Sequence, residues 1–376
     1  MSSLGSNLPE SIVRENVARL ADLMRADDFV AVILFHPANM LAFSGTPHAS
    51  SDRLTCAVVT RDHRVLLLCP AFERPAVTGA EKLAAVHTWE EHENPYESFA
   101  RMLREGGIRT GKIGLDGRVW LAAWQAFSAA LKNHQLANAE PLIRETRIIK
   151  SPTAQKLLRE AHMQGERLFF ALNELIRPEV SEIELYRQLQ ARFAPDGLFV
   201  DPMIQSGPNG AVPHNPTGER RLQLGDTVVV DSVIVHNGFH NDLTRTYAIG
   251  EPSARAKLAY KTVRQAQAAA IEAARPGVVC QVLDEIARGI IADAGFGEHF
   301  THRLGHGMGI EGHEHPYLVG GNTEKLRPGM CMSVEPGIYV PGEFGIRIED
   351  DILITDTGCE VISGRLTTDV TDAFDR

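Results

Sequence analysis

Residues 226–250 read DTVVVDSVIVHNGFHNDLTRTYAIG, and this stretch decides how the second half of the chain folds. Its two parts, DTVVVDSVIV and GFHNDLTRTYAIG, are both typical of β-strands. Asp231 interrupts the run of valines, where a charged group is costly to bury unless it is paired or bound to metal. Taken singly, Asp231 could also lie at a strand edge, and Asp242 could cap a turn.

Helical and strand-like patterns surround this stretch. MCMSVEPGIYV and GIRIEDDILIT predict further strands after it. Four helices are expected, one beginning at Ser151-Pro152 and running toward Leu175, the others at about 181–194, 253–274 and 280–293. Helices packed on a mainly antiparallel sheet would make residues 151–376 an α+β domain.

The first half of the chain predicts a smaller α/β domain, residues 1–150. Helical patterns cover residues 10–26, 94–105 and 119–133, and the strand-like segments are FVAVILF, TCAVVT, HRVLLLCP and KIGLD. The segment TRIIK, just before Ser151, also resembles a strand. A length of 376 residues itself suggests two domains.

Charge and composition disfavour several classes of protein. The net charge of −10 disfavours nonspecific binding to nucleic acid or to anionic membranes. No stretch approaches the roughly 18 apolar residues of a membrane span, and the N-terminus lacks the pattern of a secretory signal. The five cysteines show no CxxC spacing, so we expect them to be reduced and mostly buried, as in the cytoplasm. A cysteine nucleophile remains an alternative.

The stretch HRLGHGMGIEGHEHP, residues 302–316, holds four histidines, and histidine is the commonest side-chain metal ligand. Glycines alternate around His306 and make poor helix material. We therefore predict extended chain, which other backbone can approach closely. His302 and His306 would then present one side to a cavity.

Two later segments add acidic residues. In SVEPGIYV, Glu335 stands between an apolar run and a Pro-Gly turn. In GIRIEDDILIT, Arg347 and Glu349 alternate with isoleucines, so they would share one face of a strand. Three neighbouring acidic residues are expected to be surface charges: Glu343, Asp350 and Asp351.

These segments together supply four carboxylates and one imidazole: Asp231, Asp242, His306, Glu335 and Glu349. Four negative charges would balance two divalent cations, and oxygen-rich ligation suits Mn²⁺, Co²⁺ or Zn²⁺. Two such ions about 3.5–4 Å apart can activate a water and polarise a substrate carbonyl. The set therefore indicates a dinuclear hydrolase.

The order of these motifs resembles the pita-bread metallopeptidases, which include Xaa-Pro aminopeptidases, prolidases, methionine aminopeptidases and creatinase. The matching features are two aspartates 11 residues apart, then GHGxG, EPG and RIED. In the first half, HPANMLAFSG and the RIIKSP junction are similar to the creatinase/prolidase N-terminal domain. The resemblance implies a pita-bread catalytic domain after a creatinase-type domain, in a homodimer or a dimer of dimers.

The resemblance also implies residue roles. The five candidate ligands match the dimetal ligands of the family, with Asp242 and Glu349 bridging both ions. Glu335 would carry the proton, and His214 and His313 match active-site histidines. Three more residues match substrate-binding positions: His302, Tyr339 and Arg347. The sequence departs from the family at Val233, where Gly is usual, and at Asn241, where Ser is usual; neither change removes a ligand.

The activity that the resemblance implies is hydrolysis of the Xaa-Pro bond in a peptide with proline second, with Mn²⁺ as the preferred metal. Whether the substrate is a dipeptide or a longer peptide stays open. One alternative is a hydrolase or lyase acting on a small non-peptide substrate, such as an ectoine- or creatine-like compound. Another is a non-catalytic interaction module built on the same scaffold.

Overall fold

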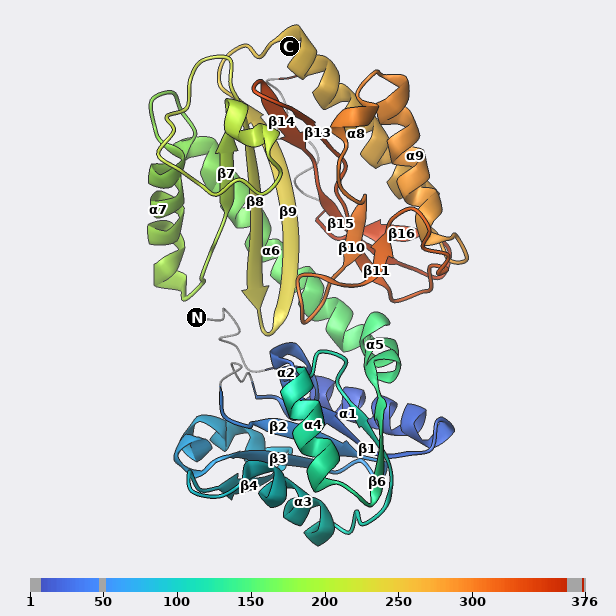
Figure 1. Cartoon of the computed structure of the whole chain (residues 1–376). Helices are drawn as coiled ribbons and strands as arrows, with labels where there is room; N and C mark the ends of the chain where they lie inside the picture. Colours follow the sequence, from blue (N-terminus) through green and yellow to red (C-terminus); the bar gives the residue numbers. More distant parts are fainter. Residues whose placement is uncertain (1–7, 47–51, 364–373, 375–376) are drawn as a thin grey trace. The chain divides into compact units, whose positions relative to one another are not determined.

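The computed structural model describes residues 8–46, 52–363 and 374. The chain divides into two compact units, Met1–Arg147 and Ile148–Arg376 (Figure 1). The first seven residues, where we expect no secretory signal, lie outside the described residues.

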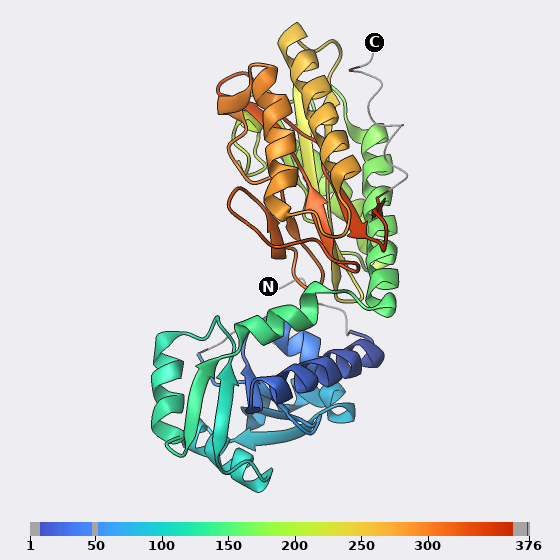
Figure 2. The same ribbon diagram turned by 90° about the vertical axis from the view of Figure 1, so that its right-hand side faces the viewer.

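The first unit has one six-stranded sheet with helices on both of its faces (Figure 2). The strand order is β4-β3-β2-β1-β5-β6; β1 is antiparallel to β2 and parallel to β5. The strands are β1 Phe29–Leu34, β2 Cys56–Thr60, β3 Val65–Pro70, β4 Ala85–Trp89, β5 Gly111–Leu115 and β6 His134–Asn138. The helices are α1 Glu10–Ala26, α2 Pro37–Ser44, α3 Pro95–Glu105, α4 Leu121–Ala130 and α5 Glu140–Ile148, with a 3-10 segment η1 Ala71–Lys82.

The core of this unit follows from the alternation along β1. Ala31 and Ile33 are fully buried and belong to one apolar cluster with Phe99 of α3 and Phe127 of α4. Phe99 and Phe127 pack edge to face, with ring centroids 4.9 Å apart. The α/β domain expected from the sequence is therefore confirmed.

The second unit contains the hairpin that the quoted stretch predicts. β8 (Thr227–His236) pairs with β9 (Phe239–Ala248) in unbroken antiparallel register. The other strands are β7 Met203–Ser206, β10 Gly305–Gly307, β11 Glu314–Leu318, β12 Cys331–Val334, β13 Gly337–Val340, β14 Phe344–Arg347, β15 Asp350–Ile354 and β16 Cys359–Val361. They form three groups, β7-β8-β9, β13-β14 and β11-β10-β12-β15-β16.

Helices cover the strands of the second unit. They are α6 Pro152–Leu175, α7 Glu182–Phe193, α8 Ala254–Ala273 and α9 Cys280–Asp293, with 3-10 segments η2 Ala194–Asp196, η3 Gly207–Ala211 and η4 Gly297–His299. α6 packs on β8 and β9, while α8 contacts β12, β13 and β14 (Figures 1 and 2). Ser151 caps α6 by accepting from the Ala154 amide, with Pro152 in the first turn, as the sequence predicts. The expected α+β class is confirmed.

The strand predicted for TRIIK is wrong, because α5 continues through Ile148. The β-branched residues of this segment suggested a strand, but Leu142, Ile143 and Thr146 are buried at the spacing of one helix face. The Thr146 hydroxyl also donates to the Leu142 carbonyl at 2.9 Å, one turn back. Packing on one side of a helix therefore overrides the strand propensity.

GIRIEDDILIT was expected to be one strand, but it forms two. β14 pairs with β13, whereas β15 pairs with β12, so the chain changes partner between Arg347 and Asp350. Asp350 and Asp351 are buried, not surface charges as expected. Arg245 donates to Asp350 at 2.6 Å, and His162 lies 2.5 Å from Asp351, so each buried carboxyl has a partner. Glu343 is exposed as expected.

Two further expectations concern the membrane and the cysteines. No helix in the described parts of the chain combines the length and apolarity that crossing a bilayer requires. All five cysteines are free thiols, and four are buried, as expected. Burial raises the pKa of Cys56 and of Cys331, which disfavours a thiolate nucleophile at either position.

Candidate active site

The two aspartates of the quoted stretch lie within strands, at neither a strand edge nor a turn. Asp231 pairs with Thr244 across the hairpin, and Val233 pairs with Asp242. Because side chains alternate along a strand and directly opposed residues share a face, both carboxylates project from the same face of the sheet. The opposite face is apolar and packs on α6.

The glycine-rich segment brings His306 to the same place as extended chain, as predicted. A Cβ atom on Gly305 would lie 2.0 Å from the Ser333 carbonyl oxygen, and one on Gly307 would lie 2.2 Å from the His315 carbonyl oxygen. Any larger residue at either position would clash with backbone, so glycine is needed for this close approach. The His306 amide donates to the Ser333 hydroxyl at 3.1 Å, which fixes the strand beside β12.

Glu335 and Glu349 come from two segments that leave regular strands at this point. Glu335 follows β12 directly, and its amide donates to the Leu304 carbonyl at 2.8 Å. Glu349 lies between β14 and β15, and its amide donates to the Thr244 carbonyl at 3.1 Å. The Thr244 hydroxyl also donates to Glu349 Oε2 at 2.7 Å. Thr244 therefore aligns Glu349 with the strand that carries Asp242.

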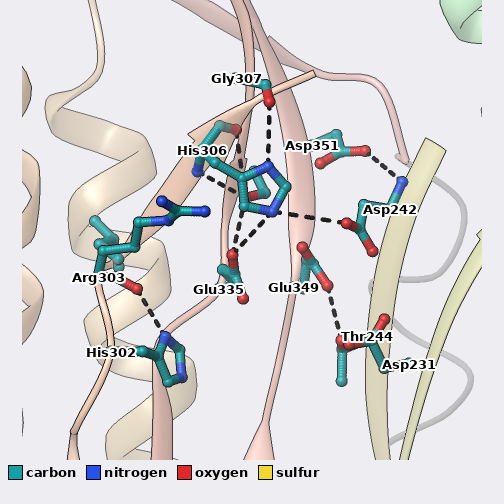
Figure 3. Close-up of polar contacts among 12 residues, drawn as sticks. Asp231, Asp242, Thr244, His302, Arg303, His306, Gly307, Glu335, Glu349 and Asp351 are labelled. Atoms are coloured by element: carbon teal, nitrogen blue, oxygen red, sulfur yellow. Dashed lines mark hydrogen bonds and ion pairs between the residues drawn. The ribbon is translucent and has the colours of Figure 1, made fainter. Parts of the chain in front are cut away.

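These side chains converge around the imidazole of His306 (Figure 3). His306 Nε2 lies 3.2 Å from Glu335 Oε1 and 3.6 Å from Asp242 Oδ2. Ligand atoms of Asp231, Asp242 and Glu349 lie within 4.8 Å of one another, as do those of His306, Glu335 and Glu349. All five residues singled out in the sequence thus share one small volume.

The electrostatics of the cluster fit bound cations. Burial, and next the charge of Asp231, raise the pKa of Asp242 well above its usual value. Burial, and next the charge of Asp242, do the same for the pKa of Glu349. Glu349 Oε1 is buried, and no residue that the structure describes forms a hydrogen bond with it. Crowded carboxyls of this kind need a proton or a cation between them, and an oxygen-rich set with one imidazole could hold Mn²⁺, Co²⁺ or Zn²⁺.

Glu335 differs from the other carboxyls. Burial alone would raise its pKa, but the hydrogen bond from His306 and the positive charge of that ring outweigh burial and lower the pKa to about 2. Its carboxylate is thus stabilised in the charged form, at a position where it also faces the pocket. A carboxylate held in its charged form at the pocket suits a metal ligand.

The cluster lies in a pocket of about 510 Å³ that also contains predicted histidines. His214 and His302 line the pocket from two different segments, and His313 lies beside His306 with ring centroids 3.9 Å apart. Burial, and next the charge of His306, lower the pKa of His313 to about 4. His313 is therefore a neutral imidazole at neutral pH.

The three residues expected to bind substrate form one connected network. Arg347 lines the pocket, and its guanidinium donates to Asp231 at 2.7 Å, to the Tyr339 hydroxyl at 2.8 Å and to the Thr244 hydroxyl at 3.1 Å. His302 Nε2 lies 2.9 Å from the same Tyr339 hydroxyl. Arg347 therefore orients the candidate ligand Asp231 and also faces the pocket. The buried Tyr339 hydroxyl contacts both Arg347 and His302 and holds them in place.

One supporting pair was missed in the sequence. His162 of α6 and Asp351 are both fully buried, and Asp351 Oδ2 also accepts from the Asp242 amide at 3.0 Å. The opposite nitrogen of His162 lies 2.7 Å from the Leu158 carbonyl. This chain of contacts ties α6 to the backbone of a candidate ligand. The available signal was the polar His162 on the mostly apolar face of α6, which packs on β8 and β9.

A second missed residue is Gln205 of β7, which supports the loop that carries His214. The fully buried Gln205 amide donates to the Pro213 carbonyl at 3.2 Å and to the Asn215 carbonyl at 2.7 Å. These two residues flank His214 directly. Buried Glu182 anchors the same loop by accepting from the Ser206 and Gly218 amides. No local pattern in the sequence predicts that Gln205 and Glu182 hold the loop that carries His214.

Comparison with known proteins agrees with this geometry. Residues 156–356 match metallopeptidase family M24, and residues 16–149 match the creatinase/prolidase N-terminal domain. The chain belongs to metallopeptidase family M24. The M24 match spans all five candidate ligands, and with the second match it confirms the two-part architecture expected from the motifs.

Individual M24 relatives cover almost the whole chain. An uncharacterized peptidase of Staphylococcus haemolyticus is 34% identical over 87% of this chain and 92% of its own length. Dipeptidase PepE from Mycobacterium ulcerans is 30% identical, covers 96% of this chain and 97% of its own, and has a TM-score of 0.87. The Xaa-Pro dipeptidase from Bacillus anthracis is 29% identical over 94% of this chain and 98% of its own, with a TM-score of 0.82. These likenesses support a hydrolase of the peptidase type.

Proposed function

We propose that this M24 protein hydrolyses the Xaa-Pro bond of peptides with a free N-terminus and proline in second place, using two divalent metal ions. The observation that carries the proposal is the convergence of four carboxylates and His306 at the floor of one pocket. The Xaa-Pro dipeptidase from Bacillus anthracis, with the same fold, supports the choice of bond.

Five residues would hold the ions: Asp231, Asp242, His306, Glu335 and Glu349. When bound, the ions would supply Lewis acidity toward the scissile carbonyl and lower the pKa of water. We propose Mn²⁺ as the native ion, with Co²⁺ or Zn²⁺ able to replace it, because the donor set is rich in oxygen.

Glu335 would move the proton of the reaction. It would take a proton from the attacking water and give it to the proline nitrogen as the peptide bond breaks. That nitrogen belongs to a tertiary amide without an N–H, so it must gain a proton before it leaves. The position of Glu335, facing the pocket and next to His306, supports this role.

The remaining polar groups would bind and orient the peptide. His313, neutral near pH 7, would donate a hydrogen bond to the scissile carbonyl oxygen. His214 and His302 would hold the residue after the cut from two sides of the pocket. Arg347 would fix Asp231, which faces the free amino group of the substrate, and Tyr339 would fix Arg347.

The direct test is release of the N-terminal residue from the dipeptide Ala-Pro and from the tripeptide Ala-Pro-Ala, each with Mn²⁺. Cleavage of the dipeptide alone would identify a dipeptidase, and cleavage of the tripeptide an aminopeptidase. If neither peptide is cleaved while two ions per chain are bound, the proposal is wrong. The alternative, a small non-peptide substrate, would then be tested first.

Removal of metal should affect both activity and stability. Treatment with a chelator should reduce cleavage of Ala-Pro to background, and Mn²⁺ should restore it. Each ion at 100 times its dissociation constant should stabilise the fold by about 2.7 kcal/mol, which raises the unfolding midpoint by about 5–11 °C per ion. Differential scanning calorimetry with and without Mn²⁺ measures this shift. An unfolding midpoint that Mn²⁺ leaves unchanged would contradict binding at this cluster, because ions that bind the folded protein must raise its free energy of unfolding.

Gln205 should be a positioning residue for His214. Replacing Gln205 with Leu frees the two carbonyls that flank His214, so kcat/KM for Ala-Pro should fall about ten- to a hundredfold. Metal content should not change, because Gln205 contacts none of the candidate ligands. The matched control is Gln155→Leu, which removes a similar amide-to-carbonyl bond, to Lys150, away from the pocket. Equal losses in both variants would show a general effect on folding instead.

The proposal also covers the location, the oligomeric state and the partners of the protein. Free, mostly buried cysteines support a location in the cytoplasm. The resemblance to prolidases supports a homodimer or a dimer of dimers, which sedimentation analysis would test. Net negative charge supports small peptides as partners rather than nucleic acid.

A further inference from the structure

One end of the pocket extends from the candidate ligands toward β7. Met203 pairs with Asp231, and Val200 forms a bridge with Ile234. The same register sets Asp201 beside Val233, which in turn pairs with Asp242. Neighbouring strands lie about 4.8 Å apart, so the row from Asp242 across Val233 to Asp201 spans about 10 Å. Asp201, Met203 and Val233 all line the pocket, and we name them the β7 arm.

The β7 arm combines an apolar floor with a carboxylate at its far end. Met203 and Val233 are partly exposed and offer only methyl, methylene and thioether groups to a ligand. Asp201 is exposed, and its Oδ1 accepts from the Tyr186 hydroxyl at 2.9 Å. Among the described residues no basic side chain forms an ion pair with Asp201, so its charge is available to a ligand in the pocket.

Two basic side chains, Arg303 and Arg347, also line the pocket. Arg347 is paired with Asp231 at 2.7 Å, so the free carboxylate of a bound peptide would meet Arg303. The N-terminal residue of the peptide, whose amino group faces Asp231, would direct its side chain toward Met203, which pairs with Asp231.

We infer that the β7 arm selects substrates whose N-terminal residue is lysine or arginine. Both side chains have an apolar stem, which would lie on Met203 and Val233, and a cationic head, which would reach Asp201. This inference rests on the proposed Xaa-Pro activity and gives it a substrate class. Asp201 is then a specificity-determining residue that contacts substrate but takes no part in the chemical step.

The test compares Lys-Pro with norleucine-Pro, because norleucine has the same unbranched stem without the charge. We expect kcat/KM for Lys-Pro to exceed that for norleucine-Pro about fivefold, the upper range for an exposed ion pair. The preference should shrink in 0.5 M salt, since screening weakens exposed charge pairs. A ratio at or below one in the unmodified protein would overturn the inference.

Variants locate the origin of the preference. Asp201→Asn should bring the ratio of Lys-Pro to norleucine-Pro to about one, and Asp201→Lys should reverse it. Glu298→Gln removes an exposed carboxylate outside the pocket and should leave the ratio unchanged. A preference that survives Asp201→Asn would contradict the role of the β7 arm. Cleavage of Ala-Pro distinguishes failure of this inference from failure of the proposed function. If Ala-Pro is cleaved and Lys-Pro is not preferred over norleucine-Pro, only the inference about the β7 arm is wrong. If no Xaa-Pro peptide is cleaved, the proposed function is wrong.

Discussion

Replacing Glu335 with Ala is expected to abolish turnover of Ala-Pro, with a loss of at least about a thousandfold in kcat. The substitution removes a candidate metal ligand and the group proposed to carry the proton, and general acid–base catalysis alone contributes about 10²–10⁴. The measurement is kcat at saturating substrate, together with metal content by elemental analysis.

Two further variants separate the roles of Glu335. Glu335→Gln keeps the shape of the side chain and one oxygen, but it cannot carry the proton, so its kcat should stay near that of the Ala variant. Glu343→Ala, at an exposed glutamate, is the control and should keep full activity. Substantial activity in Glu335→Ala with both ions bound would show that another group moves the proton.

Replacing His162 with Ala should cause the largest loss of stability. The change leaves the carboxyl of Asp351, which is fully buried, without its imidazole partner. Breaking such a buried contact costs about 3 kcal/mol, which lowers the unfolding midpoint by about 6–12 °C. Because Asp351 also accepts from the Asp242 amide, metal affinity should fall about 10–100-fold.

Thermal unfolding in the presence of chelator measures the first effect of His162→Ala, and titration calorimetry with Mn²⁺ the second. His162→Gln, whose amide can still donate to Asp351, should recover part of both. His299→Ala, at a partly exposed histidine, should change neither. Lowered stability with unchanged metal affinity would mean that the pair supports the fold without positioning Asp242.

The sequence predictions that the structure confirms rested on patterns within single short segments of the chain. The run of valines around Asp231 predicted β8, the segment GFHNDLTRTYAIG predicted β9, and the Ser151-Pro152 signal predicted the start of α6. The glycines around His306 indicated extended chain, and the close backbone contacts at Gly305 and Gly307 explain why no other residue would fit. These features could be predicted because each depends on its own segment of chain.

The failures concern residues whose environment is set by distant parts of the chain. Asp350 and Asp351 read as surface charges because nothing nearby in sequence pairs with them, yet Arg245 and His162 do so in the fold. The split of GIRIEDDILIT depends on a change of strand partner, which periodicity cannot reveal. Gln205 could not be predicted for the same reason, because its amide binds backbone carbonyls on either side of His214, in a later segment of the chain.

The five candidate ligands come from five segments between Asp231 and Glu349, and contacts with Thr244 and Arg245 hold Glu349 at the cluster. During synthesis on the ribosome, Glu349 emerges last of the five. A nascent chain that ends before it would contain four ligands but could not assemble the cluster. Under the proposed metal binding, loading with metal would report that the segments from Asp231 to Glu349 have folded together, and chains that end before Glu349 would stay free of tightly bound ions.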